Sequence, residues 1–344
     1  MKKLTKVLVT GAAGFIGFHV VQRLLQEGYH VMGLDNINNY YSQDLKRNRI
    51  KEINKSKNSK NFIFQKTNIN TKKALNDIKE YNPKYIIHLA AQAGVRNSIL
   101  YPHEYLNNNF KATLNLFELT KNIKDFEHIV YASTSSVYGL SENYPLKEDD
   151  STNHPMQFYA VTKKATELMA HSYAGLFGVP STGLRFFTVY GPWGRPDMAL
   201  FKFTKAILEG KKLDVFGHGK HIRDFTYVDD IVAGIMTILT KPPKKNKKYV
   251  KSSIPSGESI YPYRILNIGG GNPIPLMKFI KEIELNLEKK ATIDFHGIQP
   301  GDILKTESCT EKISNFGYNP STSYQVGIKK FIDWYFDYYK INKR

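Results

Sequence analysis

The sequence predicts an α/β fold with a doubly wound parallel sheet, followed by a smaller α/β domain at the C-terminal end. In the first half of the chain, short β-rich runs alternate with longer helical patterns. After about residue 190 this alternation loosens, and short strands mix with helices. Alternating strands and helices form right-handed βαβ units whose parallel strands are covered on both faces. We therefore expect residues 1–190 to form one domain and residues 191–344 a second.

The expected elements follow from where the short apolar runs and the longer amphipathic runs fall. In the first half, strands are expected at residues 6–10, 30–35, 61–66, 84–90, 128–133 and 182–187. Helices are expected at residues 15–27, 72–81, 103–121 and 157–177. In the second half we expect strands at 214–217 and 224–228, and helices at 197–209, 229–240, 275–288 and 323–341. The segment 241–264 is rich in Lys, Pro and Ser, which is typical of a surface insertion.

The composition is that of a folded protein with a large core. The chain has 344 residues, of which 41% are hydrophobic, and it includes 22 Tyr and 20 Phe. It contains no run of 18 apolar residues, and the short apolar run after the basic N-terminus is interpreted as the first strand. The single cysteine, Cys309, excludes an intrachain disulfide and indicates a reducing compartment, so we expect a cytoplasmic location.

The net charge is strongly positive, at +18. Such a charge is compatible with nucleic acid, an acidic membrane or anionic small molecules as partners. The densest basic run, residues 241–251, contains two prolines and is expected to be a solvated loop. We therefore expect no nucleic-acid or membrane partner. No His or Cys cluster has the spacing of metal ligands, so no metal site is expected.

A glycine-rich turn follows the first expected strand and opens the first expected helix. Its glycines, Gly11, Gly14 and Gly17, have the spacing G-x-x-G-x-x-G. Glycines let the backbone turn tightly and approach a pyrophosphate, and the free N–H groups of the helix N-terminus bind the anion. Asp35 ends the second expected strand, 18 residues after Gly17. Strand, turn, helix and acid together predict a Rossmann-type dinucleotide site.

The same acid predicts which dinucleotide binds. A carboxylate can accept hydrogen bonds from both ribose hydroxyls of an adenosine, but it repels a 2′-phosphate. No arginine adjoins Asp35 in the sequence DNINN. We therefore expect NAD as the cofactor rather than NADP.

A tyrosine and a lysine indicate proton-transfer chemistry. Tyr159 and Lys163 lie four residues apart in an expected helix, so they share one face. A nearby cation favours the phenolate and lowers the pKa of a tyrosine from about 10. Such a tyrosine can remove a hydroxyl proton while hydride leaves the same carbon. A hydroxyl cluster, Ser133 to Ser136, follows another strand, and in such sheets the carboxyl ends of strands face the ligand crevice.

In these motifs the sequence resembles the extended short-chain dehydrogenase/reductase family, and within it the nucleotide-sugar epimerases. The resemblance covers nearly the whole chain and rests on segments 10–17, 88–98, 133–139, 159–163, 184–199, 219–230 and 299–302. Residues 186–210 are particularly similar to the UDP-glucuronate 4-epimerases of bacterial polysaccharide synthesis. This implies an NAD-dependent isomerase that inverts C4 of UDP-glucuronate through a transient 4-keto sugar. Residues 1–190 would bind NAD and residues 191–344 the UDP-sugar.

The resemblance also implies roles for the residues around the cofactor. Tyr159 is the acid and base at the sugar 4-OH, and Thr134 hydrogen-bonds the same oxygen. Lys163 binds the nicotinamide ribose and lowers the pKa of Tyr159. The implied cofactor-binding residues are Gly11, Gly14, Phe15, Ile16, Gly17, Asp35, Asn36, Asn68, Ile69, Leu89, Ala90, Ala91, Asn109, Tyr159 and Lys163.

On the substrate side, the resemblance assigns the C6 carboxylate to three hydroxyls, those of Ser135, Ser136 and Thr188. Galactose-type epimerases usually carry Asn where Thr188 stands, and the small Thr beside extra hydroxyls is the main reason to prefer the uronate. The other implied substrate contacts are Arg223 at the diphosphate, Asp302 near the uridine ribose, and Arg96 and Arg195 as further candidates.

Two residues depart from patterns common in the family. Asn68 stands where an Asp near the adenine is common, although Asn can still accept a hydrogen bond from the adenine amine. Gln299 replaces the arginine of the galactose-type enzymes but agrees with the uronate subgroup. NAD binding should therefore survive, and the second departure supports the uronate.

Several alternative functions remain open. A UDP-glucose or UDP-N-acetylglucosamine 4-epimerase is the nearest, and a UDP-glucuronate decarboxylase is also compatible with the motifs. A 4,6-dehydratase needs an acid pair directly after Thr134, where this chain has Ser135 and Ser136. A dinucleotide-binding regulator or an RNA-binding relative is the non-enzymatic alternative, and the intact Tyr159 and Lys163 argue against it.

The resemblance further implies a homodimer. Related enzymes pair through the helices that correspond to residues 103–121 and 157–177. The apolar residues there that could form the seam are Leu106, Phe110, Leu114, Leu168 and Met169, although they could equally belong to the core.

Overall fold

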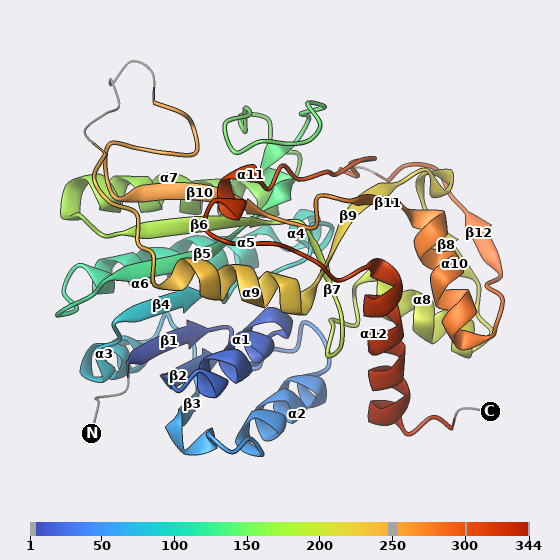
Figure 1. Ribbon diagram of the computed structural model, residues 1–344, viewed down its shortest axis with the longest axis horizontal. Coiled ribbons are helices and arrows are strands. Elements are labelled where there is room, and N and C mark those ends of the chain that lie inside the picture. Colours follow the sequence, from blue (N-terminus) through green and yellow to red (C-terminus); the bar gives the residue numbers. More distant parts are fainter. Residues whose placement is uncertain (1–4, 247–253, 300, 343–344) are drawn as a thin grey trace.

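Seven parallel strands form the central sheet of the computed structural model, which describes residues 5–246, 254–299 and 301–342. Their order is β10-β6-β5-β4-β1-β2-β3 (Figure 1), and each neighbouring pair is parallel. The strands are β1 (Lys6–Thr10), β2 (His30–Asp35), β3 (Phe62–Lys66), β4 (Tyr85–His88), β5 (His128–Thr134), β6 (Ser181–Phe186) and β10 (Tyr263–Ile268). The predicted α/β fold with a doubly wound parallel sheet is confirmed.

Helices cover both faces of this sheet and create two cores. One face carries α1 (Phe15–Gln26), α2 (Gln43–Asn54) and α9 (Val228–Leu239). The other carries α3 (Lys72–Tyr81), α6 (Ala112–Thr120) and α7 (Phe158–Phe177). Because side chains alternate along a strand, Val7 and Val9 lie in the first core and Leu8 in the second. This double burial explains why the central strands are apolar on both faces.

The predicted elements of the first half are present, with two differences. The helix expected at 103–121 is divided into α5 (Pro102–Tyr105), a π-helical turn η2 (Leu106–Lys111) and α6. Helix α2 was not predicted, because two of its inward positions are held by Lys46 and Arg49, both buried, so its apolar stripe is interrupted.

The second lobe contains two small sheets and three longer helices. One sheet has the order β11-β9-β7, from β7 (Thr188–Tyr190), β9 (Ile222–Tyr227) and β11 (Pro273–Pro275), and the other pairs β8 (Leu213–Val215) with β12 (Ile293–Phe295). The helices are α8 (Ala199–Leu208), α10 (Leu276–Leu287) and α12 (Tyr324–Tyr339). The remaining short helices are α4 (Asn97–Leu100), α11 (Glu311–Ser314), η1 (Ser59–Asn61), η3 (Ser135–Tyr138) and η4 (Gly217–Gly219).

The chain returns to the first lobe after entering the second. Strand β10 pairs with β6 at the edge of the central sheet, and α9 packs against α1 and β5. In these two elements the structure differs from the expected division at residue 190. The physical reason is that the free edge of β6 needs backbone partners and that α9 has an apolar face to bury. The expected insertion 241–264 thus ends inside β10, and its residues 247–253 lie outside the described part of the chain.

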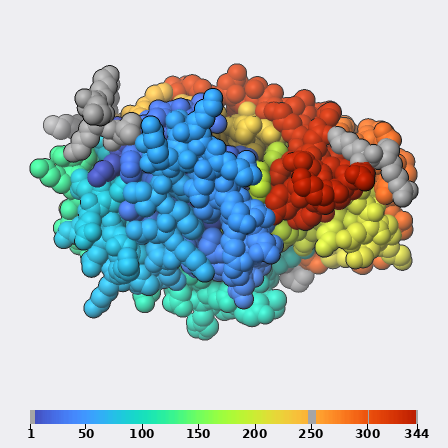
Figure 2. All heavy atoms as spheres, turned by 90° about the horizontal axis from the view of Figure 1, so that it is seen from below, coloured from blue at the N-terminus to red at the C-terminus, as the bar shows by residue number. Residues whose placement is uncertain are grey.

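Helix α12 joins the two lobes on one side of the molecule. Figure 2 shows it in red beside the blue first lobe, and Asn48 Nδ2 on α2 donates a hydrogen bond to the Tyr338 hydroxyl at 2.8 Å. The ring of Trp193 lies 5.4 Å from that of Trp334 and 5.1 Å from that of Tyr338, centroid to centroid. Within the described ranges, no helix combines the length and apolarity that crossing a membrane requires.

Candidate active site

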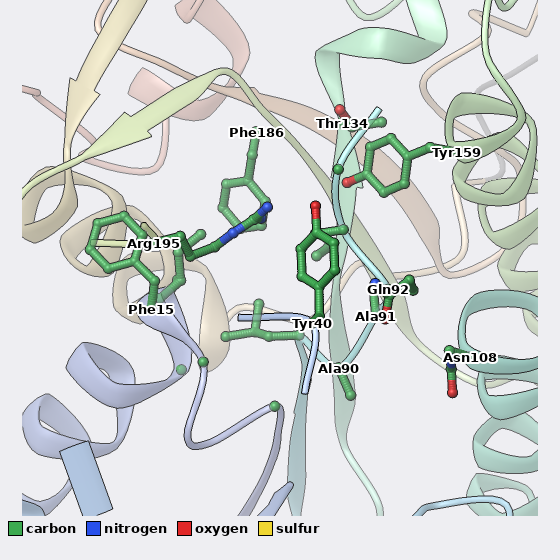
Figure 3. Close-up of a pocket in the computed structure, with 18 of the residues that line it drawn as sticks. Phe15, Tyr40, Ala90, Ala91, Gln92, Asn108, Thr134, Tyr159, Phe186 and Arg195 are labelled. Atoms are coloured by element: carbon green, nitrogen blue, oxygen red, sulfur yellow. The ribbon is translucent and has the colours of Figure 1, made fainter. Parts of the chain in front are cut away.

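A cavity of about 860 Å³ lies at the carboxyl ends of the parallel strands (Figure 3). Its walls come from the glycine-rich turn, the loops that follow β2 and β4, the end of β5 with η3, and helix α7. Residues 186–189 and the loop after β7 close it from the second lobe. In open α/β sheets this edge is where ligands bind.

Most of the predicted site residues line this cavity. On the cofactor side they are Gly11, Gly14, Phe15, Ile16, Gly17, Asp35, Asn36, Asn68, Ile69, Leu89, Ala90 and Ala91. On the catalytic and substrate side they are Thr134, Tyr159, Lys163, Arg96, Ser135, Ser136, Thr188, Arg195 and Arg223. The two predicted residues outside the lining are Asn109 and Asp302.

The glycine-rich turn leaves no room for side chains. A Cβ on Gly11, whose φ is +74°, would lie 2.8 Å from the Ala90 backbone nitrogen. A Cβ on Gly17 would lie only 2.1 Å from the carbonyl oxygen of Gly11. Both glycines are therefore required by the close packing of turn, helix and β4 loop, as a pyrophosphate cradle demands.

Asp35 is held at the end of β2 by the backbone around it. Its carboxylate accepts hydrogen bonds from Ala13 N at 3.1 Å and from Ile37 N at 2.8 Å. Burial raises the pKa of Asp35, while these bonds and the cation of Lys46 oppose the rise. Lys46 also lines the cavity, so a cation stands near the acid although none adjoins it in the sequence.

The cavity fits a dinucleotide in a further respect. Gln92 Nε2 is buried and has no hydrogen-bond partner among the described residues, and Gln92 lines the cavity. Buried donors are almost always satisfied in folded proteins. A bound dinucleotide would bring acceptors to this wall.

Tyr159 and Thr134 lie next to each other at the cavity wall (Figure 3). Burial raises the pKa of the Tyr159 phenol, and the Arg195 cation and a hydrogen bond with Thr134 oppose that rise. Lys163 instead donates to the carbonyl of Ala132 at 2.9 Å, and burial lowers its pKa to about 8. The expectation that Lys163 lowers the pKa of Tyr159 therefore stays a prediction, while the Arg195 cation opposes the effect of burial on this pKa.

Three hydroxyls form a polar wall next to this pair. Ser135 and Ser136 lie in η3, directly after Thr134, whose Oγ1 accepts from Ser136 N at 3.2 Å. Thr188 opens β7 and lines the same cavity from the second lobe. Hydroxyl donors from both lobes can therefore converge on one ligand group.

The far end of the cavity carries arginines. Arg96 Nη2 lies 3.3 Å from both carboxylate oxygens of Asp302, and its guanidinium lies 5.0 Å above the ring of Phe216. Arg223 is partly buried, which lowers its pKa to about 10, and the carboxylate of Asp302 opposes that shift. Asp302 does not line the cavity itself, but it pairs with Arg96, which does.

The sequence matches the family described as "NAD dependent epimerase/dehydratase family" over residues 7–251. The chain belongs to this family. Its site geometry agrees with the match, since the glycine turn, Asp35 and the Tyr159–Lys163 pair all fall within the matched residues.

Relatives of this family member cover nearly its whole length. Protein CapI of Staphylococcus aureus is 44% identical, over 97% of this chain and 99% of that protein. The probable UDP-glucuronate 4-epimerase of Rhizobium meliloti is 42% identical, over 97% and 98%. The crystal structure of UDP-glucuronic acid 4-epimerase from Bacillus cereus, in complex with UDP-glucuronic acid and NAD, superposes with a TM-score of 0.86. It is 34% identical and covers 97% of this chain and 100% of that one.

In this epimerase/dehydratase, Asn109 has a different place from the one predicted. Its amide accepts from Gln92 N at 2.7 Å and donates to Gln92 O at 3.1 Å and to Thr162 Oγ1 at 3.0 Å. Asn109 therefore joins the β4 loop to α7, and Asn108 is the residue that lines the cavity (Figure 3). The π-helical turn η2 widens the helix here and changes which side chain faces the site.

Sequence reasoning missed several lining residues of this family member. The most central is Tyr40, which Figure 3 shows between Arg195 and Tyr159. Its hydroxyl donates to Asp197 Oδ2 at 3.2 Å, and Asp197 also pairs with Arg195. Their position in the sequence could have indicated them, because Tyr40 and Asp197 lie in loops that follow the carboxyl ends of strands, where ligands bind. The other lining residues that were not predicted include Lys46, Gln92, Phe186, Phe187 and Lys202.

One group of potential metal ligands occurs in the part of the chain that the structure describes. Asp214 on β8, Asp294 on β12 and His296 directly after β12 place their ligand atoms within 4.8 Å of one another. No such group was expected, because these residues are far apart in the sequence. The two acids are exposed, and none of the three residues lines the cavity.

Proposed function

We propose that this protein is an NAD-dependent epimerase that inverts C4 of UDP-glucuronate to give UDP-galacturonate. The observation that carries the proposal is the hydroxyl wall of Ser135, Ser136 and Thr188 beside the Tyr159–Thr134 pair. The similarity to UDP-glucuronate 4-epimerases over nearly the whole chain supports it. The first lobe binds NAD, and the second lobe contributes most of the UDP-sugar site.

The chemistry at C4 requires a base, a donor and a hydride acceptor. The glycine turn and Asp35 would hold NAD, which would supply the hydride acceptor and donor for C4. Tyr159 takes the proton of the 4-OH and gives it back in the second half of the reaction. Thr134 hydrogen-bonds the same oxygen. Lys163 binds the nicotinamide ribose and favours the phenolate of Tyr159, and the Arg195 cation also opposes the rise that burial causes in the Tyr159 pKa.

The 4-keto sugar creates a hazard that the hydroxyl wall can control. A carboxylate β to a ketone loses CO2 easily when its C–C bond aligns with the carbonyl π system. Hydrogen bonds from Ser135, Ser136 and Thr188 hold the carboxylate in an orientation that disfavours this loss. Arg96 and Arg223 bind the diphosphate while the sugar turns over. Because the sugar stays attached to the bound diphosphate, the 4-keto sugar remains in the cavity while C4 is inverted.

We test this function with the purified protein and UDP-glucuronate, with and without added NAD, and follow the sugar by NMR. Formation of UDP-galacturonate without CO2 supports the proposal, and Tyr159→Phe should abolish it. Turnover of UDP-glucose or UDP-N-acetylglucosamine alone would keep the mechanism but reject the uronate. CO2 as the main product would make the protein a decarboxylase. Nucleotide binding without turnover of any sugar would favour a regulatory role.

We also propose that the protein is a homodimer. Three of the expected seam residues, Leu106, Phe110 and Leu168, are exposed on η2 and α7, which pack against each other. Leu114 and Met169 are partly buried against the core of the first lobe. An apolar face on two adjacent helices is suited to pairing with a second copy. Light scattering of the protein and of Leu168→Glu tests this, because the variant should be a monomer.

A cytoplasmic location and the absence of a nucleic-acid partner stay predictions from the sequence. They rest on the single cysteine and on the expectation from composition that the basic run at 241–251 is a solvated loop. A gel-shift titration with RNA at physiological salt checks the second of them.

A further inference from the structure

The turn directly before Arg195 is held by the first lobe through its backbone. His19 Nε2 on α1 donates to the Pro192 carbonyl at 3.0 Å. Arg49 Nη2 on α2 donates to the carbonyls of Trp193 at 2.5 Å and Gly194 at 3.3 Å. Three successive carbonyls of the second lobe thus accept hydrogen bonds from two helices of the first.

Arg49 is an unusual residue to find between the two lobes, because its charged side chain is buried. It is fully buried, yet it forms no ion pair with any described carboxylate. A buried charge is costly unless it is paired or fully hydrogen-bonded. The other end of its guanidinium, Nη1, donates to the carbonyl of Ala13 at 2.8 Å and to the Tyr41 hydroxyl at 2.7 Å. One planar group therefore links four oxygen acceptors.

The two sides of this link carry different parts of the site. Ala13 lies inside the glycine-rich turn, between Gly11 and Gly14, which line the cofactor side of the cavity. The carbonyls of residues 193 and 194 lead directly to Arg195, which lines the same cavity as Tyr159 and acts on it electrostatically. The rigid fork of an arginine can hold both backbone segments at a fixed separation, which a lysine cannot do.

The held turn has a backbone that needs support. Trp193 has φ +59°, in the left-handed region that side chains other than glycine rarely adopt. Its ring packs against Phe18 at 5.2 Å, Trp334 at 5.4 Å and Tyr338 at 5.1 Å between ring centroids. Strained residues of this kind persist where surrounding structure fixes them, and they gather at functional sites.

His19 provides the second anchor. A carbonyl oxygen only accepts, so the Nε2 atom of His19 must carry the proton. Burial, with a smaller contribution from the nearby Arg49 cation, lowers the pKa of His19 to about 4, although the hydrogen bond to Pro192 O opposes this shift. His19 is therefore neutral at pH 7 and adds no second charge to the buried contact.

We propose that Arg49 is a positioning residue that couples the glycine-rich NAD turn to Arg195, with His19 as a second anchor of the same turn. The proposal rests on the proposed function, because Arg195 matters through its place beside Tyr159 and the substrate. It predicts that NAD retention and substrate use depend together on one guanidinium that touches neither ligand.

The decisive experiment is a double-mutant cycle. With NAD added to saturation, Arg49→Met and Arg195→Met should each lower kcat/KM for UDP-glucuronate by roughly tenfold or more, and the double variant should be no worse than Arg195→Met, since one acts through the other. The rising limb of the pH–rate profile should move to higher pH in both single variants, because Tyr159 loses the nearby cation. Additive losses in kcat/KM would overturn the proposal.

The NAD content of the purified proteins separates coupling from a purely substrate-side effect. Arg49→Met should retain less NAD, whereas Arg195→Met should retain a wild-type amount. Arg47→Met, on the same helix but half exposed and paired with Asp44, should match wild type in both NAD content and kcat/KM. Wild-type NAD content in Arg49→Met would overturn the proposal. If Arg49→Met does not fold, Arg49→Lys replaces it, because lysine keeps the charge but cannot bridge the two segments.

Tryptophan fluorescence gives a readout that does not need turnover. The chain has two tryptophans, Trp193 and Trp334, so Trp334→Phe isolates the signal of the turn. In that background Arg49→Met should shift the emission of Trp193, and Arg47→Met should not.

If wild type fails to epimerise UDP-glucuronate, the proposed function fails. The coupling is then still tested by NAD content and by this emission. It is also tested by the affinity for UDP of wild type, Arg49→Met, Arg195→Met and the double variant. An unshifted emission in Arg49→Met would overturn the coupling.

Discussion

Glu167 and Arg185 form a fully buried two-point ion pair beneath the catalytic residues. Arg185 Nε lies 2.9 Å from Glu167 Oε1, and Nη2 lies 3.0 Å from Oε2. Ser133 Oγ also donates to Glu167 at 2.6 Å. Since Glu167 lies one turn after Lys163 on α7, the pair joins α7 and β6 to the end of β5, which carries Thr134.

Removing the acid of this pair should be strongly destabilising. Glu167→Ala leaves the buried Arg185 cation uncompensated, which should lower the free energy of unfolding by about 3–5 kcal/mol. Denaturant unfolding measures the change. The control is Glu52→Ala, which removes a surface pair with Lys55 and should change the same quantity by less than about 1 kcal/mol. Similar losses in the two variants would contradict the assigned role of the pair.

The hydroxyl of Thr188 should matter for the uronate and not for the neutral sugar. Thr188→Val removes one donor to a charged carboxylate, so kcat/KM for UDP-glucuronate should fall by about 10- to 100-fold. Thr188→Ser keeps the hydroxyl and should restore most of the rate. Steady-state kinetics with UDP-glucuronate and UDP-glucose measures both effects. Equal losses for the two substrates would show that Thr188 does not contact the carboxylate.

Replacing Asp35 should change the nucleotide preference. Asp35→Ser removes the acceptor for the ribose hydroxyls, so the Kd for NAD should rise by about 10- to 100-fold. The affinity for NADP should increase, because Lys46 remains near the site and no carboxylate repels the 2′-phosphate. Calorimetric titration of both nucleotides measures these changes. Asp44→Ser, an exposed position on α2, is the matched control and should alter neither affinity.

Acid should destabilise the fold through buried histidines such as His128. Burial lowers the pKa of His128 to about 3, while its Nδ1 contacts Leu239 O at 2.9 Å and its Nε2 contacts Thr182 Oγ1 at 2.8 Å. The unfolded chain binds a proton near pH 6.5 and the folded chain does not. Stability from this residue is therefore complete above pH 6.5 and is lost as the pH falls toward 3. Between pH 6.5 and 5 the loss is about 2 kcal/mol.

Urea unfolding at pH 7, 6 and 5 checks this pH dependence. His128→Asn keeps a donor for Leu239 O but does not titrate, so its stability should fall less steeply over the same range. Parallel curves for the variant and wild type would show that His128 does not contribute.

Much of the first lobe could be predicted, because its signals are local. Strands β1 and β2 fall where the apolar runs lie, and the spacing of Gly11, Gly14 and Gly17 is a requirement of one turn. Helix α2 could not be found in this way, since Lys46 and Arg49 occupy its inward face and remove the apolar period. Strand β10 was missed because it completes the sheet from a distant part of the chain.

The sequence by itself determined the sheet strands β1 to β6, the cofactor turn with Asp35, and the Tyr159–Lys163 pair. Each of these depends on residues within one or two successive elements, where backbone geometry sets the spacing. Only the tertiary structure decided that Arg195 lines the same cavity as Tyr159, that Tyr40 reaches Asp197, and that Arg49 donates to the Trp193 carbonyl. These contacts join segments more than a hundred residues apart or from different lobes, and they follow from the packing of the lobes. Local sequence patterns do not predict how the two lobes pack against each other.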